Sequence, residues 1–179
     1  MKKLLFLSTC MIAIVGMSSC KKAAELLFKP FESPLNFDVN INPVAAGTQS
    51  NLGTTVVNYD LDAEIKDATD NRFGADFIGQ MYLNQVAISL INTDATNDLK
   101  NFESLSLTVS SGSGTPVVLG PFAVPSTATT QFSFDVPNSP NIRPYFNGSN
   151  VTFVLSGKVK TATTKTLQAH IGATIKFDK

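Results

Sequence analysis

Cysteine, tryptophan and histidine are scarce in this chain of 179 residues. It contains two cysteines, Cys10 and Cys20, a single histidine, His170, and no tryptophan. Both cysteines lie within the first twenty residues, so no disulfide can form within the rest of the chain. Stability must therefore come from an apolar core, and the 160 residues from 20 to 179 are enough to bury one.

Charge is also sparse. Charged residues make up 16% of the chain, with 14 basic against 14 acidic side chains. Without Lys2 and Lys3, which belong to the leader described below, 12 basic residues remain against the same 14 acidic ones. A net charge near −2 offers no positive surface to a nucleic-acid backbone, so we expect no nucleic-acid partner.

Long apolar runs are absent except at the start of the chain. Lys2 and Lys3 precede the apolar run 4–16, and small residues follow directly before Cys20. This order is typical of a secretory signal, and the run is too short for a stable membrane span. The segment Met17-Ser18-Ser19-Cys20 resembles the lipobox of bacterial lipoproteins.

The lipobox resemblance implies that residues 1–19 are removed as a signal peptide and that Cys20 becomes the lipidated N-terminus. Acyl chains on Cys20 would then attach the protein to the outer membrane, on either its periplasmic or its surface leaflet. An ordinary secretory signal with an incidental cysteine is the alternative. Pro30 and Pro34 oppose regular structure, so residues 20–34 are interpreted as a tether and 35–179 as the folded domain.

From Leu35 onward, apolar and polar residues alternate in short segments separated by turn signals. The period of two is clearest in 35–42 and 167–177, as in half-buried strands. No βαβ rhythm is present. The pattern predicts an all-β fold, a single antiparallel β-sandwich with immunoglobulin-like or Greek-key connections. The expected strands are 35–42, 55–61, 81–92, 104–109, 117–122, 132–136, 151–160 and 167–177.

Two short helical segments are also expected. Leu61, Ile65 and Ala68 recur at helical spacing, and Asp60 can cap a short helix at that position. A single helical turn is expected around 142–146, where it would place its apolar residues beneath the sandwich.

The run 86–92, the turn after it, and the segments 102–109 and 117–124 resemble the water-stress domain of late-embryogenesis-abundant proteins. They are also similar to small β-sandwich lipoproteins of outer membranes rich in glycan-uptake systems. The resemblance covers about half of the domain. It implies the sandwich fold and no particular activity.

Acidic residues cluster between positions 60 and 76. Carboxylates at alternate positions can converge on a hard cation such as calcium. The spacing is not that of an EF-hand, because Ile65 and Asn71 occupy the positions of its glycine and its bidentate glutamate. Two interpretations follow: a solvated, capped helix with its loop, or an irregular calcium site in a calcium-stabilised module or a metal-dependent enzyme. The acidic residues are Asp60, Asp62, Glu64, Asp67, Asp70 and Asp76.

Signatures of catalysis are missing from the sequence. His170 is a lone histidine, whereas imidazole metal sites usually recruit two or three, and no Gly-x-Ser-x-Gly motif accompanies it. The alternation places His170 on the outer face of the last strand. We therefore expect a protein that is not an enzyme, uses no cofactor and has no catalytic residues.

The remaining hypotheses concern binding. Loop aromatic residues can stack on sugars, although tryptophan, the largest stacking surface, is absent. The sequence predicts a lipid-anchored cell-envelope protein with a binding or structural role towards an envelope protein or a glycan. The alternative is a fimbrial or adhesive subunit, which needs an exposed edge strand, with 167–177 as the first candidate. The loop aromatic residues are Phe73, Tyr82, Tyr145 and Phe146.

Overall fold

The computed structural model describes residues 27–112, 114–148 and 150–179. Phe31–Lys179 forms one compact unit, separate from the part of the chain that precedes it. The predicted signal peptide and Cys20 lie outside the described residues, so lipidation stays a prediction. Among the residues that are described, none of the helices has the length and apolar character needed to cross a membrane.

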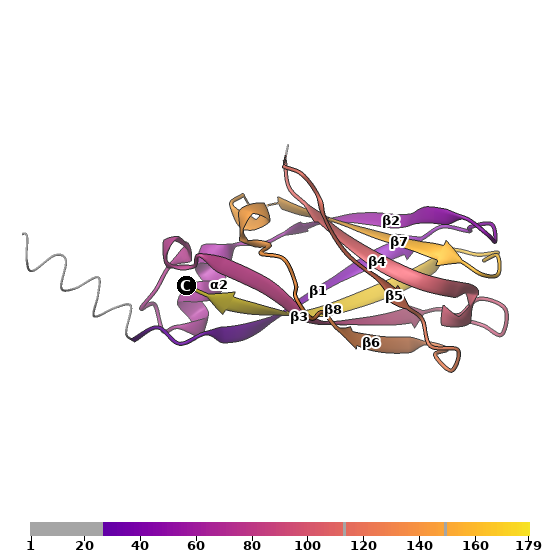
Figure 1. Cartoon of the computed structure of the whole chain (residues 1–179), viewed down its shortest axis with the longest axis horizontal. Helices are drawn as coiled ribbons and strands as arrows, with labels where there is room; N and C mark the ends of the chain where they lie inside the picture. The colour runs from indigo at the N-terminus through magenta and orange to yellow at the C-terminus, as the bar shows by residue number, and fades with distance from the viewer. Residues whose placement is uncertain (1–26, 113, 149) are drawn as a thin grey trace, which may run out of the picture. The chain divides into compact units, whose positions relative to one another are not determined.

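The unit Phe31–Lys179 is built from two four-stranded antiparallel sheets (Figure 1), which confirms the predicted β-sandwich. One sheet has the order β1-β8-β3-β6 and the other β2-β7-β4-β5. The strands are β1 (Phe31–Ile41), β2 (Gln49–Asn58), β3 (Gln80–Ile91), β4 (Phe102–Ser110), β5 (Val117–Ala123), β6 (Gln131–Asp135), β7 (Asn150–Val159) and β8 (Leu167–Asp178).

The connections between strands are of the Greek-key type. An immunoglobulin-like sandwich keeps its first two strands in one sheet, whereas β1 and β2 lie in different sheets here. Most consecutive strands change sheet, and the β4–β5 pair is the consecutive pair that shares one. This strand order is that of a jelly roll, an eight-stranded sandwich made of two Greek keys.

Two expectations about the ends of the domain are corrected by the strand order. β1 begins at Phe31, within the segment expected to be a tether, and it includes Pro34 opposite Thr174. Proline is tolerated there because β1 is an edge strand, where a missing N–H need not break a ladder. β8 is not an edge strand: it lies between β1 and β3 and pairs with both, so it offers no free edge to another subunit.

The core lies between the two sheets and follows the predicted alternation. Val86, Ile88 and Leu90 of β3 are buried, as expected. Phe37 of β1 stacks on Phe153 of β7 across the sandwich, with ring centroids 4.3 Å apart. Gly53 of β2 lies so close to β1 that a Cβ atom there would be 2.2 Å from a backbone carbonyl oxygen.

Both predicted helical segments are present. Helix α2 (Leu61–Ala68) begins after Asp60, whose Oδ1 accepts the N–H of Ala63 at 3.0 Å. The expected turn is the 3₁₀ helix η3 (Arg143–Phe146), and Ile142 and Phe146 are buried beneath it. Two further 3₁₀ turns are η1 (Ala75–Phe77) and η2 (Leu99–Asn101). In Figure 1, α2 lies at the end of the sandwich where β8 ends.

Candidate functional site

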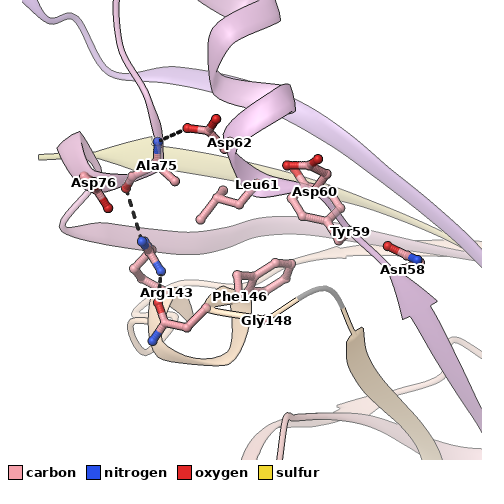
Figure 2. A pocket seen from close by; sticks show the side chains of 11 residues that line it. Asn58, Tyr59, Asp60, Leu61, Asp62, Ala75, Asp76, Arg143, Phe146 and Gly148 are labelled. Atoms are coloured by element: carbon pink, nitrogen blue, oxygen red, sulfur yellow. Dashed lines mark hydrogen bonds between the residues drawn. The ribbon is translucent and has the colours of Figure 1, made fainter.

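A pocket of about 430 Å³ lies at the α2 end of the sandwich (Figure 2). Its walls come from two connections that are distant in sequence, one running from β2 through α2 to η1 and the other containing η3. The volume is within the usual range for small-molecule sites. Its polar lining groups belong to Asn58, Tyr59, Asp60, Asp62, Asp76, Arg143 and Asn147.

Arg143 holds the two walls together. Its guanidinium donates from Nε to the carbonyl of Ile78 at 3.2 Å and from Nη2 to the carbonyl of Ala75 at 3.1 Å. It also donates from Nη1 to the side-chain oxygen of Asn147. A rigid guanidinium can reach several acceptors at once, so one side chain fixes η3 against η1. Figure 2 shows the contact between Arg143 and Ala75.

Asp62 fixes the loop between α2 and η1. Its Oδ1 accepts the N–H of Ala75 at 2.9 Å, and its Oδ2 lies 2.5 Å from Nζ of Lys66. The Lys66 ammonium, together with the Ala75 N–H, holds the pKa of Asp62 below its usual range. A Cβ atom at Gly74 would lie 2.7 Å from Asp62 Oδ1, so glycine permits this close approach.

Other polar groups of the pocket are not used by the fold. Asn58 and Asp76 are exposed, and neither side chain is hydrogen-bonded to another part of the chain that the structure describes. Asp60 uses Oδ1 as the cap of α2, which leaves Oδ2 available. The pocket therefore presents amide and carboxylate groups to an incoming molecule.

Tyr59 forms the inner wall together with Phe146. The two rings meet edge to face, with centroids 5.1 Å apart. Tyr59 is only 9% exposed, and its hydroxyl is buried without a hydrogen-bond partner in the described part of the chain. Burial, with a smaller effect from the charge of Glu64, raises the pKa of Tyr59, so the hydroxyl keeps its proton. An unsatisfied buried hydroxyl costs about 1–3 kcal/mol and calls for an explanation.

The acidic residues predicted as calcium ligands do not converge on one point. They have different partners: Glu64 of α2 accepts from Ser33 Oγ, and Asp70, in the turn after α2, lies 3.6 Å from Arg72. Within the described ranges, no group of three or more His, Cys, Asp or Glu residues could hold a metal ion. Three of the six, Asp60, Asp62 and Asp76, line the pocket, and Glu64, Asp67 and Asp70 do not.

His170 is exposed on the outer face of β8, as predicted. Its Nδ1 lies 2.7 Å from Oδ1 of Asp38 on the neighbouring strand β1. Ser89 of β3 is opposite His170 in the register, but no serine of the described chain is hydrogen-bonded to the imidazole. The arrangement is a cross-strand pair on a sheet face.

The aromatic residues expected in or near loops are used in different ways, and Tyr82 lies on β3. Phe146 lines the pocket from its buried position. Tyr82 lines a second, more open pocket of about 390 Å³ beside Lys176. Tyr145 donates its hydroxyl to the carbonyl of Thr115 at 2.6 Å, and Phe73 packs on Phe77. None of these four rings is a free stacking platform at the α2 pocket.

The sequence did not identify the second wall of this pocket. Arg143 and Asn147 lie about eighty residues from α2, and although a helical turn was expected around 142–146, no pattern indicated that it would lie against α2 and η1. The alternation predicted a strand over 55–61, whereas β2 ends at Asn58 and Leu61 begins α2. The pattern gave no sign of what lies opposite.

No family model matches this chain, and no curated protein matches it. Similar solved structures include the capsid of cyanophage Pam1, at 9% identity over 84% of this chain and 88% of that one, with a TM-score of 0.40. The BFDV capsid protein is 9% identical over 84% of this chain and 99% of its own, with a TM-score of 0.30. The Triatoma virus capsid is 10% identical over 82% of this chain and 88% of its own, with a TM-score of 0.34. At these values the likeness says nothing about function.

Proposed function

We propose that this protein is a lipid-anchored, non-catalytic binding module of the bacterial cell envelope, and that it holds its ligand in the pocket between α2 and η3. The observation that carries the proposal is the set of polar groups that the fold leaves unused there. Asn58 and Asp76 have no side-chain partner within the described residues, and the Tyr59 hydroxyl is buried without one. Asn58 and Asp76 are exposed, whereas the Tyr59 hydroxyl is buried, and folded proteins rarely leave a buried polar group unpaired.

The anchoring half of the proposal rests on the segment that ends at Cys20. The chain enters the sandwich at the α2 end, because Ser33 near the start of β1 is hydrogen-bonded to Glu64 of α2. A fully extended chain from Cys20 to Phe31 spans at most about 40 Å. Acylation at Cys20 would therefore keep the pocket end of the domain within a short reach of the membrane surface.

Replacement of the cysteine tests the anchor. We expect the wild-type protein in the membrane fraction of the producing bacterium and in the detergent phase of a Triton X-114 extract. Cys20→Ala should move it to the soluble fraction, because the acyl chains are the membrane contact in this proposal. Cys10→Ala, within the leader, is the matched control and should change nothing. Membrane retention of Cys20→Ala would contradict the anchor.

Protease treatment of intact and lysed cells then decides the leaflet. Digestion of the domain on intact cells would mean that it faces outward, towards extracellular ligands. Protection until lysis would mean that it faces the periplasm and binds a component of the envelope itself.

A further inference from the structure

We propose that the free edge of β2 pairs with the same edge of a second copy of this chain, so that two sandwiches join through one continuous antiparallel sheet. This inference goes beyond the proposed function and uses neither the anchor nor the ligand of the α2 pocket. It rests on three features of β2: an unprotected edge, an inner face that is incompletely buried, and an exposed valine at the centre of the free segment.

The edge of β2 lacks the devices that usually keep a sheet edge from pairing with another chain, which include proline, charged side chains and short length. The other three edge strands of the two sheets carry such devices. β1 contains Pro34 and Asp38, β5 contains Pro121, and β6 has five residues and ends at Asp135. β2 has ten residues, none of which is charged or proline. It is therefore the edge that is least protected against pairing.

The free part of this edge is the segment 54–58. The preceding part of β2 contains the bulge between Asn51 and Gly53, and Gly53 closely approaches Asn40 of β1. From 54 to 58 the backbone pairs with β7 and, within the described chain, with no other strand. The outward N–H and C=O groups of this segment can therefore accept another extended strand.

The inner face of the segment is incompletely covered. Thr55 and Val57 are opposite Phe153 and Val151 of β7, and directly opposite residues lie on the same face of a sheet. Phe153 and Val151 are 1% and 0% exposed, whereas Thr55 and Val57 are only half-buried. A strand added at this edge would cover the part of Thr55 and Val57 that the sandwich leaves open.

Val56 is the middle residue of the free segment, and its side chain is 60% exposed. When two identical five-residue segments overlap completely in an antiparallel pair, the twofold axis passes through the middle residue. Val56 would then lie opposite the same residue of the second copy, and Thr55 would lie opposite Val57. Cross-strand pairs of β-branched residues stabilise a sheet, and β2 has no charge to oppose them. The segment is thus complementary to itself, which favours a second copy as its partner.

Charge exchange at position 56 tests both the pairing and its register. Sedimentation equilibrium of the detergent-solubilised full chain over a series of concentrations measures the dimer. We expect the wild type to dimerise, and Val56→Lys and Val56→Glu each to weaken the dimer by about tenfold, because like charges would be directly opposite. An equimolar mixture of the two variants should recover the dimer, because a lysine then faces a glutamate.

Val118 of β5 provides the matched control. It is 61% exposed on an edge strand that also contains Pro121. Val118→Lys adds the same charge at a similarly exposed valine and should dimerise as the wild type does. Circular dichroism should show a native spectrum for every variant, because both valines are exposed. Recovery of the dimer in the mixture requires that both Val56 variants are folded.

Three results would overturn the proposal. The first is a wild-type protein that stays monomeric at every concentration. The second is a dimer that Val56→Lys leaves unchanged, which would place the contact on another surface. The third is a mixture of Val56→Lys and Val56→Glu that fails to recover the dimer, which would mean that position 56 does not face itself. The outcome of the Cys20→Ala experiment affects none of these results.

Discussion

Asp94 and Lys165 form an ion pair of 2.7 Å that joins the connection after β3 to the connection before β8. The same carboxylate accepts the backbone N–H groups of Thr96 and Asn97, each at 2.9 Å. The Lys165 ammonium above all, and then the hydrogen bonds from Asn97 and Thr96, hold the pKa of Asp94 far below its usual range. The fold at this end of the sandwich therefore favours the charged form of Asp94.

Acid should remove the contribution of Asp94 to stability. Because folding lowers its pKa, the contribution is complete above the ordinary aspartate value of about 3.9 and is lost as the pH falls below it. We expect Asp94→Asn to be less stable than the wild type at pH 7, and the difference to shrink between about pH 5 and pH 2. Urea denaturation over a pH series measures the stability difference between the wild type and Asp94→Asn. Asp67→Asn, at an exposed position, is the control. A difference that stays constant on acidification would contradict the prediction.

Asn101 should be essential for stability at the same end of the domain. It is 5% exposed, and its Nδ2 donates to the carbonyls of Thr96 at 3.0 Å and Ala162 at 3.1 Å, while its Oδ1 accepts the N–H of Asp98 at 2.9 Å. Asn101→Ala leaves these buried groups unpaired, at about 1–3 kcal/mol for each group that water cannot reach. We expect a loss of at least about 2 kcal/mol in the free energy of unfolding.

Denaturant titration with Asn40→Ala as the control separates this effect from the general cost of losing an asparagine. Asn40 is exposed on β1, so its replacement should change stability by less than about 0.5 kcal/mol. Equal losses in the two variants would show that the Asn101 hydrogen bonds are replaced by water.

The Phe37–Phe153 stack predicts where the core is least tolerant of substitution. Phe153 is 1% exposed and lies between the sheets, so Phe153→Ala should lower the free energy of unfolding by about 3–5 kcal/mol. Val118→Ala, at a position 61% exposed on β5, should change it by no more than about 0.5 kcal/mol. Thermal unfolding, monitored by circular dichroism, compares the two variants. Similar unfolding midpoints would mean that the space left by Phe153 collapses.

The sequence predicted which face each strand buries but not which strands are neighbours. Alternation in 167–177 identified a strand, and its exposed-edge role was wrong because β8 pairs on both sides. Proline at position 34 suggested a tether, yet an edge position tolerates it. A turn was expected after the run 86–92, and Asn97 and Asn101 within this connection are buried because their partners include residues 161–164.

Only one of the two walls of the candidate site was predictable from the sequence. Asp60, Asp62 and Asp76 are close in sequence, so their clustering is visible without a structure. Arg143 comes from the connection between β6 and β7, and only the jelly-roll strand order brings it to η1. A period-two pattern determines on which face of a sheet a residue lies, whereas the pairing of strands distant in sequence depends on the folded topology.

Arg143 should control the shape of the pocket. Arg143→Lys keeps the charge, but an ammonium cannot reach the carbonyls of Ala75 and Ile78 and the amide of Asn147 together. Losing about two net hydrogen bonds predicts a decrease of about 1–3 kcal/mol in the free energy of unfolding, measured by denaturant titration. Arg72→Lys is the matched control, because Arg72 donates to a single backbone carbonyl, that of Thr69, and it should lose less than about 0.5 kcal/mol. Stability that is unchanged in Arg143→Lys would mean that charge alone, and not the geometry of the guanidinium, holds η3 against η1.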